Sequence, residues 1–178
     1  MTDVSNKHHS KVAAAVEVAK NIWIGDAVAS KDKEFMDKVN IRAIINLTPH
    51  LPNCTLIDVE CIQIPVHDLR GLRDQDLFLQ YLPCITEFIY KVAVIEDNSI
   101  LLHCVKGRQR SAAAMAAYLI KFYDMLPMEA MNYLLARKED VFHWGKSVNF
   151  AEALNKWYHQ TSMNKLTKQS VRKPKAKT

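Results

Sequence analysis

The stretch LLHCVKGRQRS, residues 101–111, joins an apolar run to an alanine-rich one. The residues NSILLHC predict a short buried strand, and SAAAMAAYLIKFY predicts a helix. The loop between them holds a cysteine, a glycine and three cations, Lys106, Arg108 and Arg110. Unpaired amides and the helix dipole both favour negative charge at a helix N-terminus. The stretch therefore predicts an anion-binding loop between a strand and a helix.

The loop residues suit the chemistry of a phosphate group. Gly107 permits a turn that aims backbone amides inward, and Arg110 offers a planar fork that matches two phosphate oxygens. We expect these positive surroundings to lower the pKa of the Cys104 thiol. A thiolate beside bound phosphate is a nucleophile for phosphoryl transfer. The alternative is that Cys104 is a small buried hydrophobic residue.

The pattern H-C-x-x-G-x-x-R-S is formed by His103, Cys104, Gly107, Arg110 and Ser111. It resembles the signature of the cysteine-based protein tyrosine phosphatases. The segments IWIGDAVASKDKEFMDKVNIRAIINLT, IQIPVHD and MLPMEAMNYLLARKEDVF are similar to parts of the small dual-specificity phosphatases within that superfamily. In size and plainness the chain resembles their poxviral, stand-alone type.

Strands that alternate with helices, followed by further helices, predict an α/β fold. The resemblance implies one domain with a mostly parallel, mixed sheet of about five strands flanked by helices. We expect a disordered N-terminus over residues 1–9, a short helix over 10–20, the catalytic domain over 21–162 and a basic, disordered tail over 163–178.

The resemblance also assigns roles to loop residues. Cys104 is the expected nucleophile, and Arg110 is expected to hold the equatorial phosphate oxygens. His103 is expected to orient the loop, and Ser111 to hydrogen-bond the departing sulfur. Phosphate is expected to bind to the loop as a whole, which comprises Val105, Lys106, Gly107, Arg108, Gln109 and Arg110.

The expected general acid is Asp68, which follows the strand in IQIPVHD. The segment after it is longer than usual for the family, so Asp74 remains an alternative, although Asp74 and Asp76 read better as helix caps. Family members often carry Asn-Pro-x-Phe before the last helix, with the Asn bracing the catalytic loops. Here the residues are Ser147, Val148, Asn149 and Phe150, so either Ser147 or Asn149 could be the brace.

The substrate is less tightly defined than the reaction. Phosphoproteins carrying phosphotyrosine and phosphoserine or phosphothreonine are the first expectation. Lys106 and Arg108 are unusual in protein-directed members and resemble the inositide-directed branches, so phosphoinositides or inositol phosphates are the alternative. A 5′-terminal RNA phosphate comes third. A module that binds phosphorylated partners without turnover is a further class, and the intact set of Cys104, Arg110 and Asp68 argues against it.

Composition places broader limits. The chain of 178 residues has a formal net charge of +5, and its last fourteen residues, KLTKQSVRKPKAKT, contain six cations and no acid. This tail is expected to be solvated, with anionic lipid or nucleic acid as its alternative partner. We expect no cofactor, no metal and no transmembrane segment, and an intracellular site that is cytoplasmic, nuclear or virion-associated. The apolar face of the helix at 10–20 needs a partner. The resemblance to the poxviral type, in which an N-terminal helix exchanges between subunits, implies a homodimer through this helix, and packing on its own domain is the alternative.

Overall fold

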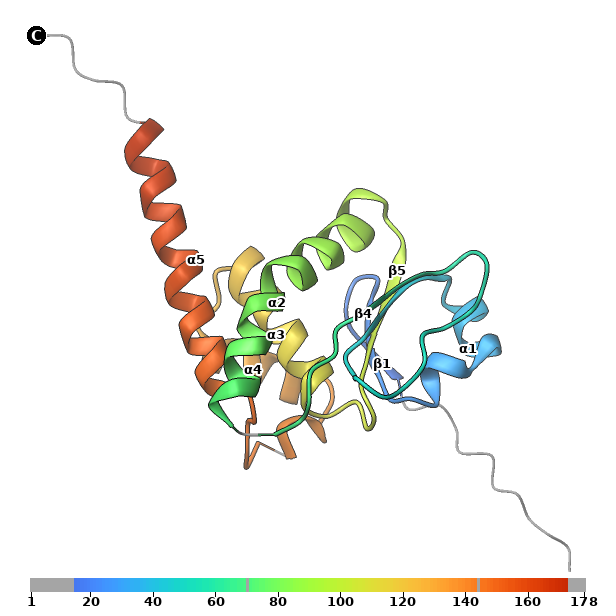
Figure 1. Cartoon of the computed structure of the whole chain (residues 1–178). Helices are drawn as coiled ribbons and strands as arrows, with labels where there is room; N and C mark the ends of the chain where they lie inside the picture. Colours follow the sequence, from blue (N-terminus) through green and yellow to red (C-terminus); the bar gives the residue numbers. More distant parts are fainter. Residues whose placement is uncertain (1–14, 70, 144, 173–178) are drawn as a thin grey trace, which may run out of the picture.

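The computed structural model describes residues 15–69, 71–143 and 145–172. Five strands are interspersed with helices along the chain, which ends in a run of helices after β5 (Figure 1). The strands are β1 (Ala15–Ala19), β2 (Ile22–Gly25), β3 (Ile41–Asn46), β4 (Glu60–Gln63) and β5 (Ser99–His103). The helices are η1 (Ala29–Lys31), α1 (Lys33–Lys38), α2 (Leu72–Tyr90), the π-turn η2 (Lys91–Ile95), α3 (Arg110–Phe122), α4 (Pro127–Leu135), η3 (Val141–His143) and α5 (Ala151–Arg172).

The strands form one mixed sheet in the order β1-β2-β5-β3-β4. The pairs β2–β5, β5–β3 and β3–β4 are parallel, and only β1 runs antiparallel, against β2. Parallel neighbours need crossover connections. Helices supply those from β2 to β3 and from β4 to β5, whereas residues 47–59 join β3 to β4 without a helix. The prediction of a mostly parallel five-stranded sheet flanked by helices is confirmed.

Alternating side chains of the central strands build a core on each face of the sheet. On β5, Ile100 and Leu102 face the larger core, whereas Leu101 faces a smaller core that also contains Met36 of α1. This alternation follows from the two-residue period of a strand. Because both faces are covered, β5 is buried along its whole length, as its apolar sequence predicts.

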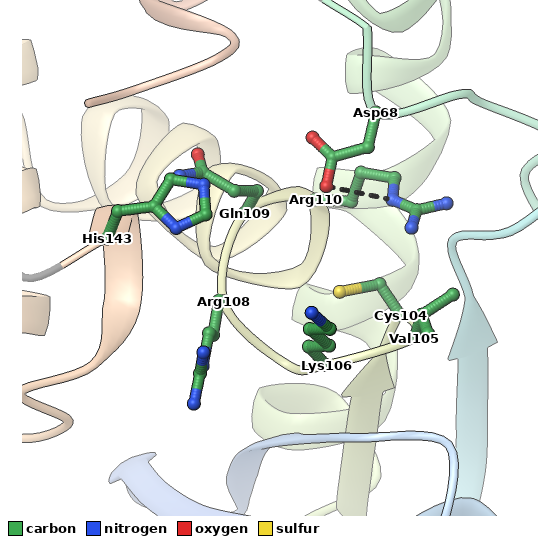
Figure 2. Close-up of a pocket in the computed structure, with 8 residues that line it drawn as sticks. All are labelled: Asp68, Cys104, Val105, Lys106, Arg108, Gln109, Arg110 and His143. Atoms are coloured by element: carbon green, nitrogen blue, oxygen red, sulfur yellow. Dashed lines mark ion pairs between the residues drawn. The ribbon is translucent and has the colours of Figure 1, made fainter.

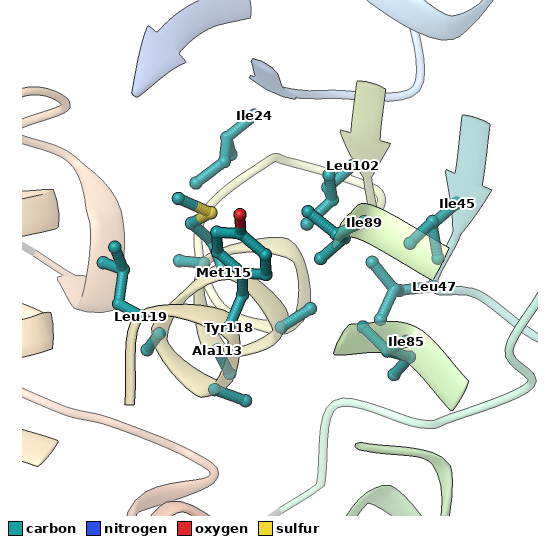
Figure 3. Close-up of a cluster of buried hydrophobic side chains, with 14 of the residues drawn as sticks. Ile24, Ile45, Leu47, Ile85, Ile89, Leu102, Ala113, Met115, Tyr118 and Leu119 are labelled. Carbon is teal, nitrogen blue, oxygen red and sulfur yellow. The ribbon is translucent and has the colours of Figure 1, made fainter. Parts of the chain in front are cut away.

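Helix α3 lies at the centre of the larger core (Figure 3). Every residue from Arg110 to Ile120 is buried, and α3 contacts α2, α4, α5 and the sheet. Its alanines permit this close approach on several sides, while Met115, Tyr118 and Leu119 fill the spaces that remain. The N-terminal end of the helix, where the sequence predicts an anion-binding loop, is therefore fixed by packing.

The prediction of a helix over residues 10–20 is wrong for residues 15–20, the part of this segment that the structure describes. Ala15–Ala19 forms β1, in which Val16 pairs with Ile24 of β2. Valines at 16 and 18 have the two-residue spacing of a strand, and β-branched side chains favour strands. Residues 10–14 lie outside the described residues. The apolar helix face on which the expected dimer rested is thus replaced by an edge strand.

The C-terminal tail also begins later than expected. Helix α5 continues from Ala151 to Arg172, through the first ten positions of the segment 163–178. Lys165 explains part of this extension, because its ammonium group donates to the Lys121 carbonyl at 3.1 Å and contacts the Asp124 carboxylate. Residues 173–178 lie outside the described residues.

One helical segment is long and apolar enough to cross a membrane by length and composition. This segment is Leu72–Ile95, which comprises α2 and η2. Part of it is buried within the fold, where Phe78, Leu82, Ile85 and Ile89 belong to the larger core. These contacts with α3 and α5 are those of a core helix.

Candidate active site

The carboxyl ends of the parallel strands meet at one edge of the sheet, and the candidate site lies there. Cys104 follows β5 directly, and residues 104–110, here called the phosphate loop, lead into α3. The loop borders a cavity of about 290 Å³ (Figure 2). The cavity is lined by Asp68, Cys104, Val105, Lys106, Arg108, Gln109, Arg110 and His143. Crevices at this edge are the usual ligand sites of α/β sheets.

Gly107 makes the tight path of the phosphate loop possible. Its φ is +67°, in the left-handed region, and a Cβ atom there would lie 2.7 Å from the carbonyl oxygen of Gly25. The loop also accepts a hydrogen bond through the Val105 carbonyl from the Ala27 amide, at 3.3 Å. Only glycine fits between the loop and the end of β2.

The Cys104 thiol is buried at the base of the cavity, and its pKa is lowered. Burial alone would raise this pKa. The hydroxyl and backbone N–H of Ser111, the charge of Arg110 and the backbone N–H of Arg108 act in the opposite sense and prevail. The Ser111 hydroxyl oxygen lies 3.5 Å from the Cys104 sulfur. Because two amides from the loop and the helix N-terminus stabilise the sulfur anion, the site favours a thiolate.

Arg110 lies over the cavity with its side chain only 9% exposed. Its Nη1 donates to the Val66 carbonyl at 3.3 Å, which fixes the direction of the guanidinium. Its Nε is buried and makes no hydrogen bond to any part of the chain that the structure describes. A buried, fixed donor beside a nucleophilic thiol is suited to bind an oxyanion.

Asp68 and Arg110 approach each other across the same cavity. The Asp68 Oδ2 atom lies 3.7 Å from the Arg110 Nε, too far for a hydrogen bond. The other carboxylate oxygen, Oδ1, accepts a hydrogen bond of 2.7 Å from the Asn149 side-chain amide. This hydrogen bond holds the Asp68 carboxyl group, which lies above the Cys104 sulfur in Figure 2.

The segment before α5 is tied to the phosphate loop through Gln109. The Gln109 side chain donates to the Ser147 carbonyl at 2.9 Å and accepts from the Asn149 amide at 3.1 Å. From the other side, buried Gln75 of α2 donates to the Asn149 carbonyl and accepts from the Ala153 amide. Two glutamines thus hold the backbone that places the Asn149 side chain against Asp68.

The two extra loop cations are placed differently. Arg108 forms an ion pair with Asp140, with 2.9 Å between Nε and Oδ2. Lys106 is exposed at the rim of the cavity. His143 also lines the cavity, and it follows Phe142 in a pair of left-handed residues with φ of +51° and +49°. Left-handed backbone at two successive non-glycine residues is strained, and such strain concentrates at functional sites.

His103 is buried behind the loop and is held neutral. Burial lowers its pKa to about 4, although the Cys104 backbone and the Asp26 carboxylate act to raise it. A neutral imidazole at this position fits a part in orienting the loop, as the resemblance implies.

The structure thus brings together Cys104, Arg110, Ser111, His103 and Asp68. It does not bring Asp74 or Asp76 to the cavity, because both lie within α2, where Asp76 pairs with Lys156 at 3.1 Å. Sequence reasoning missed Gln75, Gln109 as a brace, Asp140 and His143. Of these four residues, only Gln75 could have been found from the sequence. It lies on the buried face of α2, and a buried polar side chain needs a hydrogen-bond partner.

A buried thiolate in an amide-lined loop, with a fixed arginine and a carboxylic acid beside it, defines a cysteine-based phosphatase domain. The family model "Dual specificity phosphatase, catalytic domain" matches residues 22–160. The chain therefore belongs to the dual specificity phosphatase family.

Curated relatives agree with this membership. The chain is 28% identical over 122 residues to dual specificity protein phosphatase 21 of Homo sapiens. This match covers 68% of this chain and 62% of that protein. The first relatives include dual specificity protein phosphatase 18 of Rattus norvegicus, also 28% identical, of which 60% is covered. The chain spans about three fifths of the length of these relatives.

Solved structures show the same fold. Human DUSP28 superposes with a TM-score of 0.72 at 22% identity, covering 83% of this chain and 95% of that one. PTPMT1 in complex with PI(5)P gives a TM-score of 0.69 at 19% identity, covering 85% of this chain and 98% of that one. At these identities the likeness establishes the fold alone.

Proposed function

We propose that the protein is a dual-specificity phosphatase that hydrolyses phosphotyrosine and phosphoserine or phosphothreonine through a phosphocysteine intermediate. One observation carries the proposal. The Cys104 sulfur, stabilised as a thiolate, faces the same cavity as the fixed guanidinium of Arg110 and the carboxyl group of Asp68. Nucleophile, anion-binding group and proton donor are the three elements that phosphomonoester transfer to a cysteine requires.

In the first step the Cys104 thiolate attacks phosphorus. The S–P bond forms as the P–O bond to the substrate breaks, and Asp68, in its acid form, gives a proton to the leaving oxygen. Arg110 and the loop amides bind the equatorial oxygens as negative charge grows on them. The products of this step are the free hydroxyl, phosphocysteine and the Asp68 carboxylate.

In the second step water replaces the sulfur. The Asp68 carboxylate takes a proton from the attacking water, so a P–O bond forms while the S–P bond breaks. The Ser111 hydroxyl, which lies 3.5 Å from the sulfur, donates to the departing thiolate. Inorganic phosphate leaves, and Cys104 and Asp68 return to their starting forms.

The state of Arg108 supports phosphoprotein over inositide substrates. A second loop cation would favour inositides if its charge were available to a second phosphate. Arg108 is instead paired with Asp140 at 2.9 Å, with both side chains about one third or less exposed. Lys106 is the remaining extra cation of the loop, and a single exposed ammonium binds phosphate less specifically than a guanidinium fork.

Two other functions remain defined alternatives. The inositide alternative rests on Lys106 and Arg108 in the loop and on the fold likeness to PTPMT1, whose structure holds PI(5)P. The binding-module alternative needs a site that recognises phosphate without turnover. The presence of Cys104, Arg110 and Asp68 around one cavity supports turnover instead.

The experiment is a comparison of kcat/KM, measured in EDTA, on a phosphotyrosine peptide, a doubly phosphorylated Thr/Tyr peptide and soluble phosphoinositides. Cys104→Ser serves as the blank. We expect the peptides to be preferred. Preference for the inositides would overturn the choice of substrate, and phosphate binding without turnover by the wild type would establish the binding module.

A further inference from the structure

Three charged side chains link the phosphate loop to the segment after α4. Arg108 Nε lies 2.9 Å from Asp140 Oδ2, and the Lys138 ammonium contacts the other oxygen, Oδ1. The Lys138 side chain is only 7% exposed, so it depends on this carboxylate for a partner. The single negative charge of Asp140 is therefore shared between a cation of the phosphate loop and a buried cation.

The carboxylate is fixed in place and in charge. Burial alone would raise the pKa of Asp140, but hydrogen bonds and charge from Lys138 and Arg108 outweigh it and lower the pKa. The backbone adds a second tie, since the Phe142 amide donates to the Arg108 carbonyl at 2.9 Å. Arg108 is held by both its side chain and its backbone.

In this arrangement Arg108, a cation in the wall of the cavity, is paired with Asp140. Arg108 lines the cavity together with Cys104 and Arg110. In Figure 2 its guanidinium points away from the Cys104 sulfur, whereas the Arg110 guanidinium lies above it. Arg108 and Arg110 are two residues apart in one loop, so a freed Arg108 would lie within reach of a phosphate next to the one that Arg110 holds.

We propose that Asp140 is a specificity-determining residue, which holds Arg108 away from the substrate and so restricts the loop to a single phosphate group. Loss of Asp140 opens the site to inositol phosphates that carry a second phosphate on the neighbouring ring position. A guanidinium is the side chain best suited to such a group, because it binds phosphate oxygens in pairs. This inference rests on the proposed phosphatase function.

The test uses the full chain and two variants. Lys138→Met/Asp140→Ala removes the acid without leaving Lys138 as a buried, unpaired charge. Lys138→Met alone is the matched control, because it retains the pair between Arg108 and Asp140. The readout is the ratio of kcat/KM for a soluble phosphatidylinositol bisphosphate with vicinal phosphates to kcat/KM for a phosphotyrosine peptide. We expect the ratio to rise about tenfold in the double variant and to stay at the wild-type value in the control.

Adding Arg108→Gln to the double variant should remove the gain. A ratio that does not rise, or a gain that survives the loss of Arg108, overturns the inference. Wild-type turnover of the phosphotyrosine peptide separates this failure from failure of the proposed function, since a wild type inactive on both substrates contradicts both. Should the double variant fail to fold, Lys138→Met/Asp140→Asn, which keeps the side-chain shape and also leaves no buried, unpaired lysine, carries the same expectation.

Discussion

The Asn149 side-chain amide donates a 2.7 Å hydrogen bond to the Asp68 carboxylate across 81 residues of sequence. The same Asn149 is joined through its backbone to Gln109 of the phosphate loop. The position of the proton donor is therefore coupled to the position of the loop that binds phosphate. Between the two candidates for the brace, the geometry selects Asn149.

Asn149→Ala should lower kcat by roughly 10- to 100-fold on serine and threonine phosphates, because the donor to Asp68 is lost and a hydrogen bond to a charged group contributes about 1.5–3 kcal/mol. Aryl phosphates with good leaving groups should be affected less, since they need less proton donation. Steady-state kinetics on both substrate types measure the difference. Ser147→Ala is the matched control, because its carbonyl still accepts from Gln109. Equal effects of the two substitutions would contradict the assignment.

Asp68→Asn should reduce kcat on phosphoserine peptides by roughly 10²–10⁴, the usual contribution of general acid catalysis. Steady-state kinetics on one such peptide measure the loss. If Asp68→Asn retains the wild-type kcat, the proton donor is another residue.

Ser111→Ala should raise the pKa of Cys104, because a hydrogen bond to the thiolate is removed. The thiolate is present above the pKa and is lost as the pH falls through it. In the wild type, whose pKa is lowered, alkylation by iodoacetate should therefore persist to a lower pH than in the variant. Mass spectrometry of the Cys104 peptide against pH gives the inflection, and the exposed Cys84 in the same digest monitors the reagent. If the wild type and Ser111→Ala show the same inflection pH, Ser111 does not stabilise the Cys104 thiolate.

Gly107→Ala should destabilise the fold by about 1–3 kcal/mol and abolish turnover, because the new Cβ would lie 2.7 Å from the Gly25 carbonyl at a φ of +67°. Thermal denaturation and kcat/KM measure the two effects. Gly71→Ala is the control, since a Cβ there would meet its nearest atom, Asp74 Oδ2, at 3.7 Å. A well-folded, active Gly107→Ala variant would show that the loop tolerates another path.

The strand, loop and helix around Cys104 could be predicted because each signal is local. The apolar run, the glycine and the alanine-rich helix follow one another within 26 residues, 98–123. At Ala15–Ala19 the local signal is ambiguous, since its alanines and valines fit either element, and the pairing with β2 decides for a strand. The sequence of one segment does not show which other segment it pairs with, so this strand could not be predicted from residues 15–19 alone.

The contacts that complete the site are equally non-local. Asn149 meets Asp68 and Asp140 meets Arg108 across 81 and 32 residues. No spacing rule connects such positions, because their distance depends on how α4 and α5 pack against α3 and how α5 packs against α2. The later start of the tail has the same origin, since Lys165 of α5 contacts Lys121 in the last turn of α3 and Asp124, which follows that helix.

The central claim, a phosphocysteine at Cys104, is tested most directly with Asp68→Asn and an activated aryl phosphate. This substrate needs little proton donation to form the intermediate, whereas hydrolysis of the intermediate still needs the Asp68 carboxylate. Mass spectrometry of the acid-quenched protein should therefore find one phosphoryl group, located on Cys104. An unmodified protein after release of the aryl alcohol, or a phosphoryl group on any other residue, would contradict the account.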